Sequence, residues 1–354
     1  MSQYSMFVGC VYWLLVVVQL FLQDVKTDTF FVSHNGGDSD NCGNRTMPCR
    51  TVRHAVKMVG DGGQIYIDYA QGTPYMECEK IRQSTYAIQM AKSLSLHGIN
   101  GKAEITCTKG YGLFNISSPN TNVSSVKFFN LVISNSYIAV RLDLGTRSRL
   151  VFQNVLIKNN EIAIYSKHST DCFIVIINST FENNFSGAGT RLECLNVTAQ
   201  IISSTFKLTP ALFANIGDKP PRWQSMRVLV RDVVIDSKKI QICTDMFAIK
   251  LSAAIVNITI SDSQIKNHVA NCKYRDKISA LRVYGRQSSI KIYSHIFLSN
   301  VLVENNRNNW FTLRLDGVYS GFVKIVIQDS IFRNNSAALW LGSIGGRLDM
   351  ATSP

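Results

Sequence analysis

The chain has 354 residues, a formal net charge of +13 and a hydrophobic content of 46%. Outside residues 7–22 it contains no long apolar run, which excludes a protein with several membrane spans. Net positive charge suits nucleic-acid binding, but the nine cysteines indicate an oxidising compartment, so we expect no nucleic-acid partner.

The start of the chain is predicted to be a targeting segment. Residues 7–22 form an almost wholly apolar run, which has the length of a signal peptide and is short for a membrane span. We therefore predict a signal peptide at residues 1–23 and a secreted, extracellular protein. A signal anchor is the alternative, because no Lys or Arg precedes the run and no clean cleavage site follows it. Apart from such an anchor, we expect no membrane span.

Residues 24–78 are predicted to form an N-terminal cap and a first coil. A β-rich run at residues 30–33 leads into a Gly-rich turn. Further on, Thr51 is a suitable start for a short amphipathic helix. Such a helix would cover a strand edge that would otherwise promote aggregation. Its apolar face would consist of Val52, Ala55, Val56 and Val59.

A seven-residue motif recurs along the body, which we place at residues 79–345. Most copies begin with Asn or Asp, all have a hydrophobe fourth, and most end in Asn-Asn or Asn-Ser, as in Asn154-Val-Leu-Ile-Lys-Asn-Asn160. The spacing between successive copies is near-regular, and several copies follow a short run rich in Val, Ile and Phe. The copies start at Asn130, Asn154, Asn178, Ser203, Asp232, Asp262, Asn300 and Asp329.

A period of this length is typical of a solenoid, in which each coil buries its apolar side against the next. The fourth motif positions would then stack into an internal column, and Asn at the turns would tolerate left-handed backbone and form side-chain ladders. An antiparallel sandwich is the alternative, but it would require hairpin turns every 8–12 residues. We therefore predict an all-β parallel β-helix. The internal column would contain Ile133, Ile157, Phe181, Phe206, Ile235, Ile265, Val303 and Phe332.

The opening segment carries a more specific resemblance. The segments at residues 30–38, 48–55, 60–67 and 72–75 are similar to the start of right-handed parallel β-helix (pectin-lyase-like) proteins, in particular secreted domains of animals and protists. The resemblance covers about residues 29–345. It implies a right-handed solenoid whose first coil is covered by a short N-terminal capping helix.

Two segments interrupt the repeat. Residues 207–227 and 269–286 are interpreted as loop excursions from the solenoid, and long excursions often carry binding surfaces. Residues 346–354 are predicted to form a tail after the last coil.

Eight cysteines follow the signal peptide, an even number that favours disulfides. Pairing of nearest neighbours is attractive because three of the four separations approximate one coil, although sequence alone does not fix the connectivity. A zinc site is disfavoured because the chain has no CxxC or HxxxH spacing. The candidate disulfide cysteines are Cys42, Cys49, Cys78, Cys107, Cys172, Cys194, Cys243 and Cys272.

Sequons for N-glycosylation support secretion. Asn178 also lies in a sequon, but we interpret it as a ladder residue that faces inward. The predicted acceptors are Asn44, Asn115, Asn122, Asn184, Asn196, Asn257 and Asn334.

The positive charge is concentrated in the second half of the chain, at residues 201–354. A solenoid can align such residues into a stripe that attracts acidic glycans or extracellular proteins. A solvated surface without a partner is the alternative. The candidate basic surface consists of Lys238, Lys239, Lys273, Arg275, Lys277, Arg282 and Arg286.

Candidates for catalysis are few. Asp232 and Asp262 begin two consecutive motif copies and would approach one another if stacked, although Asp there also simply replaces Asn as a turn former. Asp38, Asp40 and Asn41 could together hold calcium, but the opening loop is a sufficient explanation for them and is favoured. We therefore expect no cofactor and no metal. A non-catalytic extracellular binding or adhesion module is favoured, and a polysaccharide lyase or glycoside hydrolase is the alternative.

Overall fold

The structure is a computed structural model. It describes residues 28–78, 86–108, 110–117, 124–142, 147–184, 189–209, 212–215, 225–237, 247–253, 255–267, 279–285, 292–306, 311–316, 321–335, 339–341 and 348–352. The predicted signal peptide at residues 1–23 lies outside these ranges. Within them, no helix is both long enough and apolar enough to cross a membrane.

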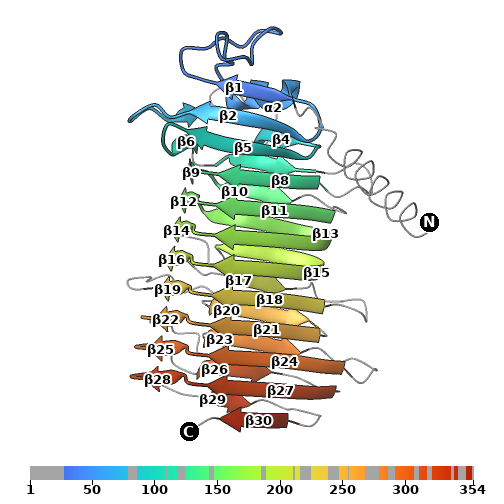
Figure 1. Ribbon diagram of the computed structural model, residues 1–354. Coiled ribbons are helices and arrows are strands. Elements are labelled where there is room, and N and C mark those ends of the chain that lie inside the picture. Colours follow the sequence, from blue (N-terminus) through green and yellow to red (C-terminus); the bar gives the residue numbers. More distant parts are fainter. Residues whose placement is uncertain are drawn as a thin grey trace, which may run out of the picture.

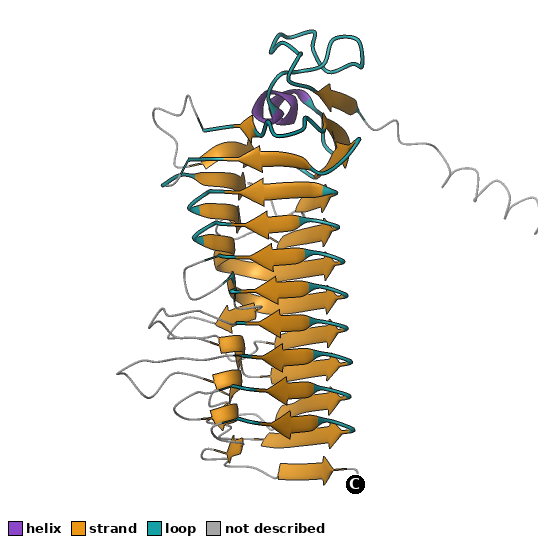
Figure 2. Ribbon diagram, turned by 90° about the vertical axis from the view of Figure 1, so that its left-hand side faces the viewer, coloured by secondary structure: helices purple, strands orange, loops and turns teal. Residues whose placement is uncertain are grey.

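The fold is a right-handed parallel β-helix, as predicted. All strand pairings among the described residues are parallel, and the coils stack from the helical cap at one end to β30 at the other (Figures 1 and 2). The coils contribute strands to three faces, which we call sheets 1, 2 and 3.

Sheet 1 begins at the cap and runs the length of the solenoid. It contains β1 (Thr29–Val32), β2 (Gly63–Asp68), β5 (Leu94–Ile99), β8 (Ser124–Phe129), β11 (Arg147–Gln153), β18 (Ser225–Arg231), β21 (Ile255–Ser261), β24 (Ile292–Ser299), β27 (Gly321–Gln328) and β30 (Leu348–Thr352).

Sheet 2 contains β4 (Tyr86–Met90), β7 (Gly112–Ile116), β10 (Ile138–Leu142), β17 (Leu212–Asn215), β20 (Phe247–Ala253), β23 (Ser279–Gly285), β26 (Phe311–Asp316) and β29 (Leu339–Leu341). Two long strands, β13 (Ile162–Ile177) and β15 (Thr190–Ile202), run from sheet 2 into sheet 1 and join them.

Sheet 3 is the narrow face. It contains β3 (Tyr75–Met76), β6 (Ala103–Thr106), β9 (Leu131–Ser134), β12 (Leu156–Lys158), β14 (Thr180–Glu182), β16 (Thr205–Lys207), β19 (Val234–Asp236), β22 (Gln264–Lys266), β25 (Leu302–Glu304) and β28 (Ile331–Arg333).

The predicted internal column is confirmed on sheet 3. The fourth motif residues register with one another from coil to coil, from Ile133 opposite Ile157 to Val303 opposite Phe332. Phenylalanines extend this core, with the rings of Phe181 and Phe206 stacked 4.8 Å apart. Alternation of buried and outward residues along most strands of this face therefore fixes the register, because a slip of one residue would turn the column outward.

The first residue of every motif copy turns a corner between sheets 1 and 3. All of these residues have left-handed backbone, with φ from 47° to 57°. Asn and Asp tolerate this conformation better than most residues, which explains why every copy except the one at Ser203 begins with one of them. The predicted turn role of these positions is confirmed.

The seventh motif position forms a buried ladder. Asn160 is fully buried, its Oδ1 accepts hydrogen bonds from the Ser136 backbone N–H at 3.0 Å and hydroxyl at 2.7 Å, and its Nδ2 donates to Asn184 Oδ1 at 3.1 Å. Asn184 Oδ1 also accepts from the Asn160 backbone N–H. Such a ladder satisfies the backbone of a corner that water does not reach.

The capping helix α2 (Val52–Met58) begins where predicted. The Thr51 hydroxyl accepts from His54 N–H, and the buried Glu77 carboxylate accepts from the backbone N–H groups of Val52 at 2.7 Å and Arg53 at 3.1 Å. The helix buries the predicted apolar face against the first coil. Its N-terminal donors, which need partners at any helix start, are thus satisfied by side chains.

Three predicted disulfides are confirmed. Cys42–Cys49 closes the opening loop, and Cys78–Cys107 and Cys172–Cys194 join successive coils. Three disulfides fit an extracellular protein. Cys243 and Cys272 lie outside the described residues.

Three predicted segments differ from the structure. The two excursions each contain a strand of sheet 2, β17 within residues 207–227 and β23 within residues 269–286. Part of the expected tail is β30, which pairs with β27 and continues sheet 1. In each case the chain returns to the coil, because strand edges exposed by the preceding coil need partners.

Candidate functional site

The two catalytic candidates lie at corners of the solenoid. Asp232 and Asp262 occupy equivalent exposed positions on consecutive coils, with φ of 55° and 51°. The Asp262 carboxylate accepts a hydrogen bond from Asn300 Nδ2 at 2.9 Å, so it takes part in an outer Asn/Asp ladder. The left-handed backbone of both residues agrees with their interpretation as turn formers.

In the candidate calcium site, the Asp38 carboxylate is hydrogen-bonded to other groups of the chain. The Asp38 carboxylate accepts bonds from the backbone N–H groups of Arg50 and Thr51 and from the Thr51 hydroxyl at 2.7 Å. Burial raises the pKa of Asp38, but these hydrogen bonds outweigh it and hold the pKa below its usual value. Asp40 and Asn41 are exposed. Asp38 therefore fastens the loop to the helix start.

Cys42, Cys49 and His54 lie close enough together to resemble a metal-binding group. The two sulfurs are bonded to one another, however, and a disulfide lacks the thiolates that bind a metal. The His54 Nε2 atom lies 3.1 Å from the Ser39 carbonyl oxygen. This group is a structural element of the cap.

The sequence-predicted basic surface falls largely outside the described residues. Lys238, Lys239, Lys273, Arg275, Lys277 and Arg286 lie outside the described residues, and for Arg282 only the backbone is described. Arg282 lies in β23, and its Cα registers with Lys250 of β20 on one side and Arg314 of β26 on the other.

Arg282 is therefore one member of a longer row on sheet 2, which we call the cationic column. The row follows one register position through seven strands, from β10 to β26, and five of its seven positions are basic. Its positions are Arg141, Tyr165, Arg191, Phe213, Lys250, Arg282 and Arg314. At a strand spacing of about 4.8 Å, the row is roughly 29 Å long.

Aromatic rings stack against the two arginines of this column that lie nearest the cap. The Arg141 guanidinium lies 5.4 Å from the centre of the Tyr86 ring and donates to its hydroxyl at 3.2 Å. Arg191 lies 5.8 Å from the Tyr165 ring and forms an ion pair with Glu193 at 2.6 Å. Stacking orders each guanidinium, and the ion pair with Glu193 also offsets part of the charge of Arg191.

Tyr165 is a neutral hydrogen-bonding group in this row. Burial is the main cause that raises its pKa, and the nearby Glu193 carboxylate raises it further. The phenol therefore keeps its proton at neutral pH and does not offset the positive charge of the column.

Sheet 1 also carries cations. Arg149, Arg227 and Lys324 are exposed and share one register column on its outer surface. The same surface holds two sequon residues, Asn196, which is exposed, and Asn257, which is partly exposed. A glycan on either would cover part of this face.

The predicted glycosylation sites divide by burial. Asn115 and Asn184 are 7% and 1% exposed and bond to neighbouring coils, which argues against glycans there in the folded chain. The interpretation of Asn178 as an inward residue is wrong, because it lies at an exposed corner. Asn44 and Asn334 are exposed, whereas Asn122 lies outside the described residues.

Sequence reasoning missed most of the cationic column. Arg141, Arg191, Lys250 and Arg314 are isolated in the sequence and belong to none of the basic clusters. The row can be recognised in the sequence only where successive coils have the same number of residues. Arg141 and Tyr165, for example, follow the starts of their own motif copies at the same distance. Lys250 lies further from the start of its copy, so the signal is lost there.

Comparison with protein-family models gives no match, and comparison with curated proteins gives no significant match. Among solved structures, the chain is similar to one titled rhamnogalacturonan lyase, with 12% sequence identity and a TM-score of 0.35. The similarity covers 85% of this chain and 74% of that one. It is a similarity of fold class alone.

Proposed function

We propose that this protein is a secreted, non-catalytic binding module that holds acidic glycans along the cationic column of sheet 2. The observation that carries the proposal is the alignment of five basic positions in one row of parallel strands. A linear polyanion lying along the solenoid axis would meet a cation at most coils.

The choice of face has independent support. Among the described residues, the one sequon on sheet 2 is at the buried Asn115, whereas Asn196 and Asn257 lie on the outer surface of sheet 1. If these acceptors carry glycans, sheet 2 remains the uncovered basic face. The rigid spacing of a β-helix also lowers the ordering cost of binding, because the cations are positioned before the ligand arrives.

The test uses the purified chain and two immobilised polymers, one sulfated and one built of uronic acids. Binding is measured at low salt and again at about 0.5 M salt, where exposed charges are strongly screened. Binding that disappears at high salt without release of soluble sugar products supports the proposal. Product release would instead identify an enzyme, and the absence of binding at low salt would refute the proposal.

A matched pair of variants distinguishes the effect of the column's location from the effect of the protein's net charge. The first replaces Arg141, Lys250 and Arg314 by Gln, and the control makes the same change at Arg149, Arg227 and Lys324 on sheet 1. Both lose three positive charges. At roughly 0.2–1 kcal/mol for each exposed ion pair, the first should weaken binding about threefold to a hundredfold, and the control should change it little. Equal loss in both variants would contradict a role for the column.

A further inference from the structure

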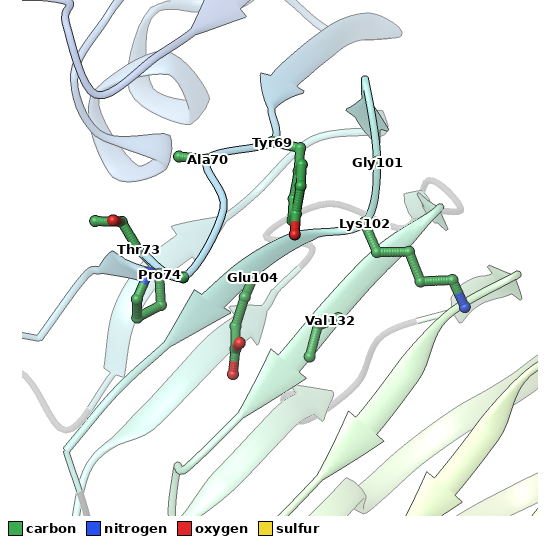
Figure 3. Close-up of a pocket in the computed structure, with 9 residues that line it drawn as sticks. Tyr69, Ala70, Thr73, Pro74, Gly101, Lys102, Glu104 and Val132 are labelled. Atoms are coloured by element: carbon green, nitrogen blue, oxygen red, sulfur yellow. The ribbon is translucent and has the colours of Figure 1, made fainter.

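A cavity of about 510 Å³ lies beside sheet 3 near the cap, on a different face from the row of cations on sheet 2 (Figure 3). The loop that follows β2 forms one wall, and β6 and β9 form the floor. The volume is within the range of sites for small molecules. Its lining includes Tyr69, Gly101, Lys102, Glu104 and Val132.

The walls of this cavity are held in place by hydrogen bonds. Tyr69 donates its backbone N–H to the Ile99 carbonyl at 3.0 Å, and the Tyr75 hydroxyl donates to the Asp68 carbonyl at 2.7 Å. The opposite wall is fixed by Asn130, whose Nδ2 donates to the carbonyls of Gly98 and Gly101. The cavity is therefore formed before any ligand binds, which reduces the entropy lost on binding.

One wall is a flat aromatic surface. Gly101, at φ +145°, packs so closely on Tyr69 that a Cβ there would lie 2.7 Å from the ring. The glycine thus lets the backbone support the ring from one side. Tyr69 nevertheless remains 40% exposed. In Figure 3 its side chain points toward Glu104 and Val132.

The carboxylate inside the cavity is held by two neighbouring side chains. The Glu104 carboxylate accepts from the Ser134 hydroxyl at 2.6 Å and forms an ion pair with Lys158 at 3.3 Å. Lys102 contributes its aliphatic stem, and its side chain runs away from Tyr69 and Glu104 (Figure 3). The interior therefore offers an apolar face and an anionic carboxylate that Ser134 and Lys158 hold in place.

We propose that this cavity binds a single uncharged pyranose unit. A pyranose has an apolar C–H face, which suits the Tyr69 ring, and equatorial hydroxyl groups, which suit the acceptor oxygens of Glu104. A uronate would place a second carboxylate near Glu104, and binding would then be weakened by repulsion. The site is distinct in location and charge from the cationic column, and it does not depend on the function proposed for that column.

The test measures binding of three small probes by saturation-transfer NMR and titration: a neutral methyl hexopyranoside, its uronate and its amino-sugar counterpart. We expect the neutral sugar to bind, and the uronate to bind at least about tenfold more weakly, a difference of about 1.4 kcal/mol. Equal or tighter binding of the uronate or the amino sugar, or no binding of the neutral sugar, would overturn the proposal.

Variants locate the site. Tyr69→Ala should abolish or strongly weaken binding of the neutral sugar, and Glu104→Gln should weaken it, because Gln keeps only one acceptor oxygen and loses the negative charge. Tyr137→Ala and Glu161→Gln, which alter an exposed tyrosine and an exposed glutamate outside the cavity, should leave it unchanged. Glu104→Gln keeps the size of the side chain, so it remains informative if Tyr69→Ala fails to fold. If Glu104→Gln binds the neutral sugar as tightly as the parent protein does, the assignment is refuted. This holds whatever the outcome with the acidic polymers.

Discussion

At the scale of single residues, the corner positions explain the Asn and Asp bias of the repeat. Left-handed backbone costs an ordinary L-residue roughly 1–2 kcal/mol, whereas Asn and Asp visit it more readily. The motif starts all adopt it. The two acidic residues that suggested catalysis, Asp232 and Asp262, therefore need no chemical role to account for their presence.

This explanation predicts the effect of substitutions at Asp262. Asp262→Asn should leave the free energy of unfolding nearly unchanged, because Asn tolerates the corner and can still accept the bond from Asn300. Asp262→Val should lower it by about 1–2 kcal/mol, because a β-branched residue is strained at φ 51°. Urea denaturation measures both. Equal stability of the two variants would contradict the assignment of backbone strain.

Burial also predicts which of two neighbouring sequons is modified. Asn178 is exposed at a corner, whereas Asn184 lies in the internal ladder. We expect peptide mass mapping of the chain secreted from eukaryotic cells to find a glycan on Asn178 and none on Asn184. A glycan on Asn184 of the folded protein would show that the ladder forms differently from the structure described above.

The reversal of these two asparagines shows a limit of sequence reading. Both fit the repeat, and both fit a sequon. Only the coil geometry shows that the first motif position points outward at a corner, while the seventh points inward. The period of the repeat was sufficient to predict the internal column at the fourth position, because hydrophobicity marks burial directly. Asn occurs at both exposed and buried positions of the repeat, so its identity does not show whether it is buried.

At the scale of elements, the capping helix depends on a buried carboxylate. Burial is the main cause that raises the pKa of Glu77, and it outweighs the lowering by the N–H groups of Val52 and Arg53. A raised pKa in the folded state means that folding favours the protonated form. The stability contributed by Glu77 titration is therefore complete below the ordinary pKa of 4.5 and is lost as pH rises through the folded value.

Glu77→Gln removes this titration but keeps one acceptor for the helix N-terminus. The difference in unfolding free energy between the parent protein and Glu77→Gln should therefore shift against the parent as pH rises above about 4.5. Denaturant unfolding at a series of pH values measures this difference. A difference that stays constant with pH would show that the pKa of Glu77 is the same in both states.

Sheet 3 also carries a ladder of alternating charges at the fifth motif position. Opposite charges register with one another on adjacent strands, and in one pair Arg333 lies 2.7 Å from Glu304. A stack that skipped one coil would place like charges side by side. The ladder contains Lys158, Glu182, Lys207, Asp236, Lys266, Glu304 and Arg333.

Reversing one charge tests the ladder. Lys207→Glu places a carboxylate between Glu182 and Asp236, and like charges directly opposite on neighbouring strands destabilise by roughly 0.2–1 kcal/mol per pair. Lys207→Met serves as the control, since it removes the charge but retains a long side chain. Unfolding is compared at low salt and at about 0.5 M salt, where the penalty should shrink. A penalty that is the same in both variants and independent of salt would point to packing instead.

At the scale of the whole molecule, local signals predicted the architecture well. The repeat, the helix start at Thr51 and the even cysteine count each have a local physical cause. The two strands β17 and β23 escaped prediction because each lies within a segment that interrupts the repeat, and β17 has only four residues. The cationic column escaped because the sequence distance from motif start to column position differs between coils and is longer for Arg282 than for Arg141.

The length of that column leads to a prediction about the size of its ligand. If the proposed binding follows the solenoid axis, each added sugar of an acidic oligomer reaches further along a row of roughly 29 Å, so its carboxylate or sulfate meets further cations. Affinity should therefore rise steeply with oligomer length until the row is covered. Longer polymers should then gain only the statistical advantage of overlapping sites.

Titration with size-fractionated acidic oligomers at fixed salt measures this dependence. The variant that lacks Arg314 at the far end of the row should reach its plateau at a shorter oligomer than the parent protein, because the last coils no longer contribute charge. The control Lys324→Gln removes a cation at a similar height on sheet 1 and should leave the plateau length unchanged. A short oligomer that binds as tightly as a long one would instead indicate a local site, and the column would then be a solvated surface without a ligand.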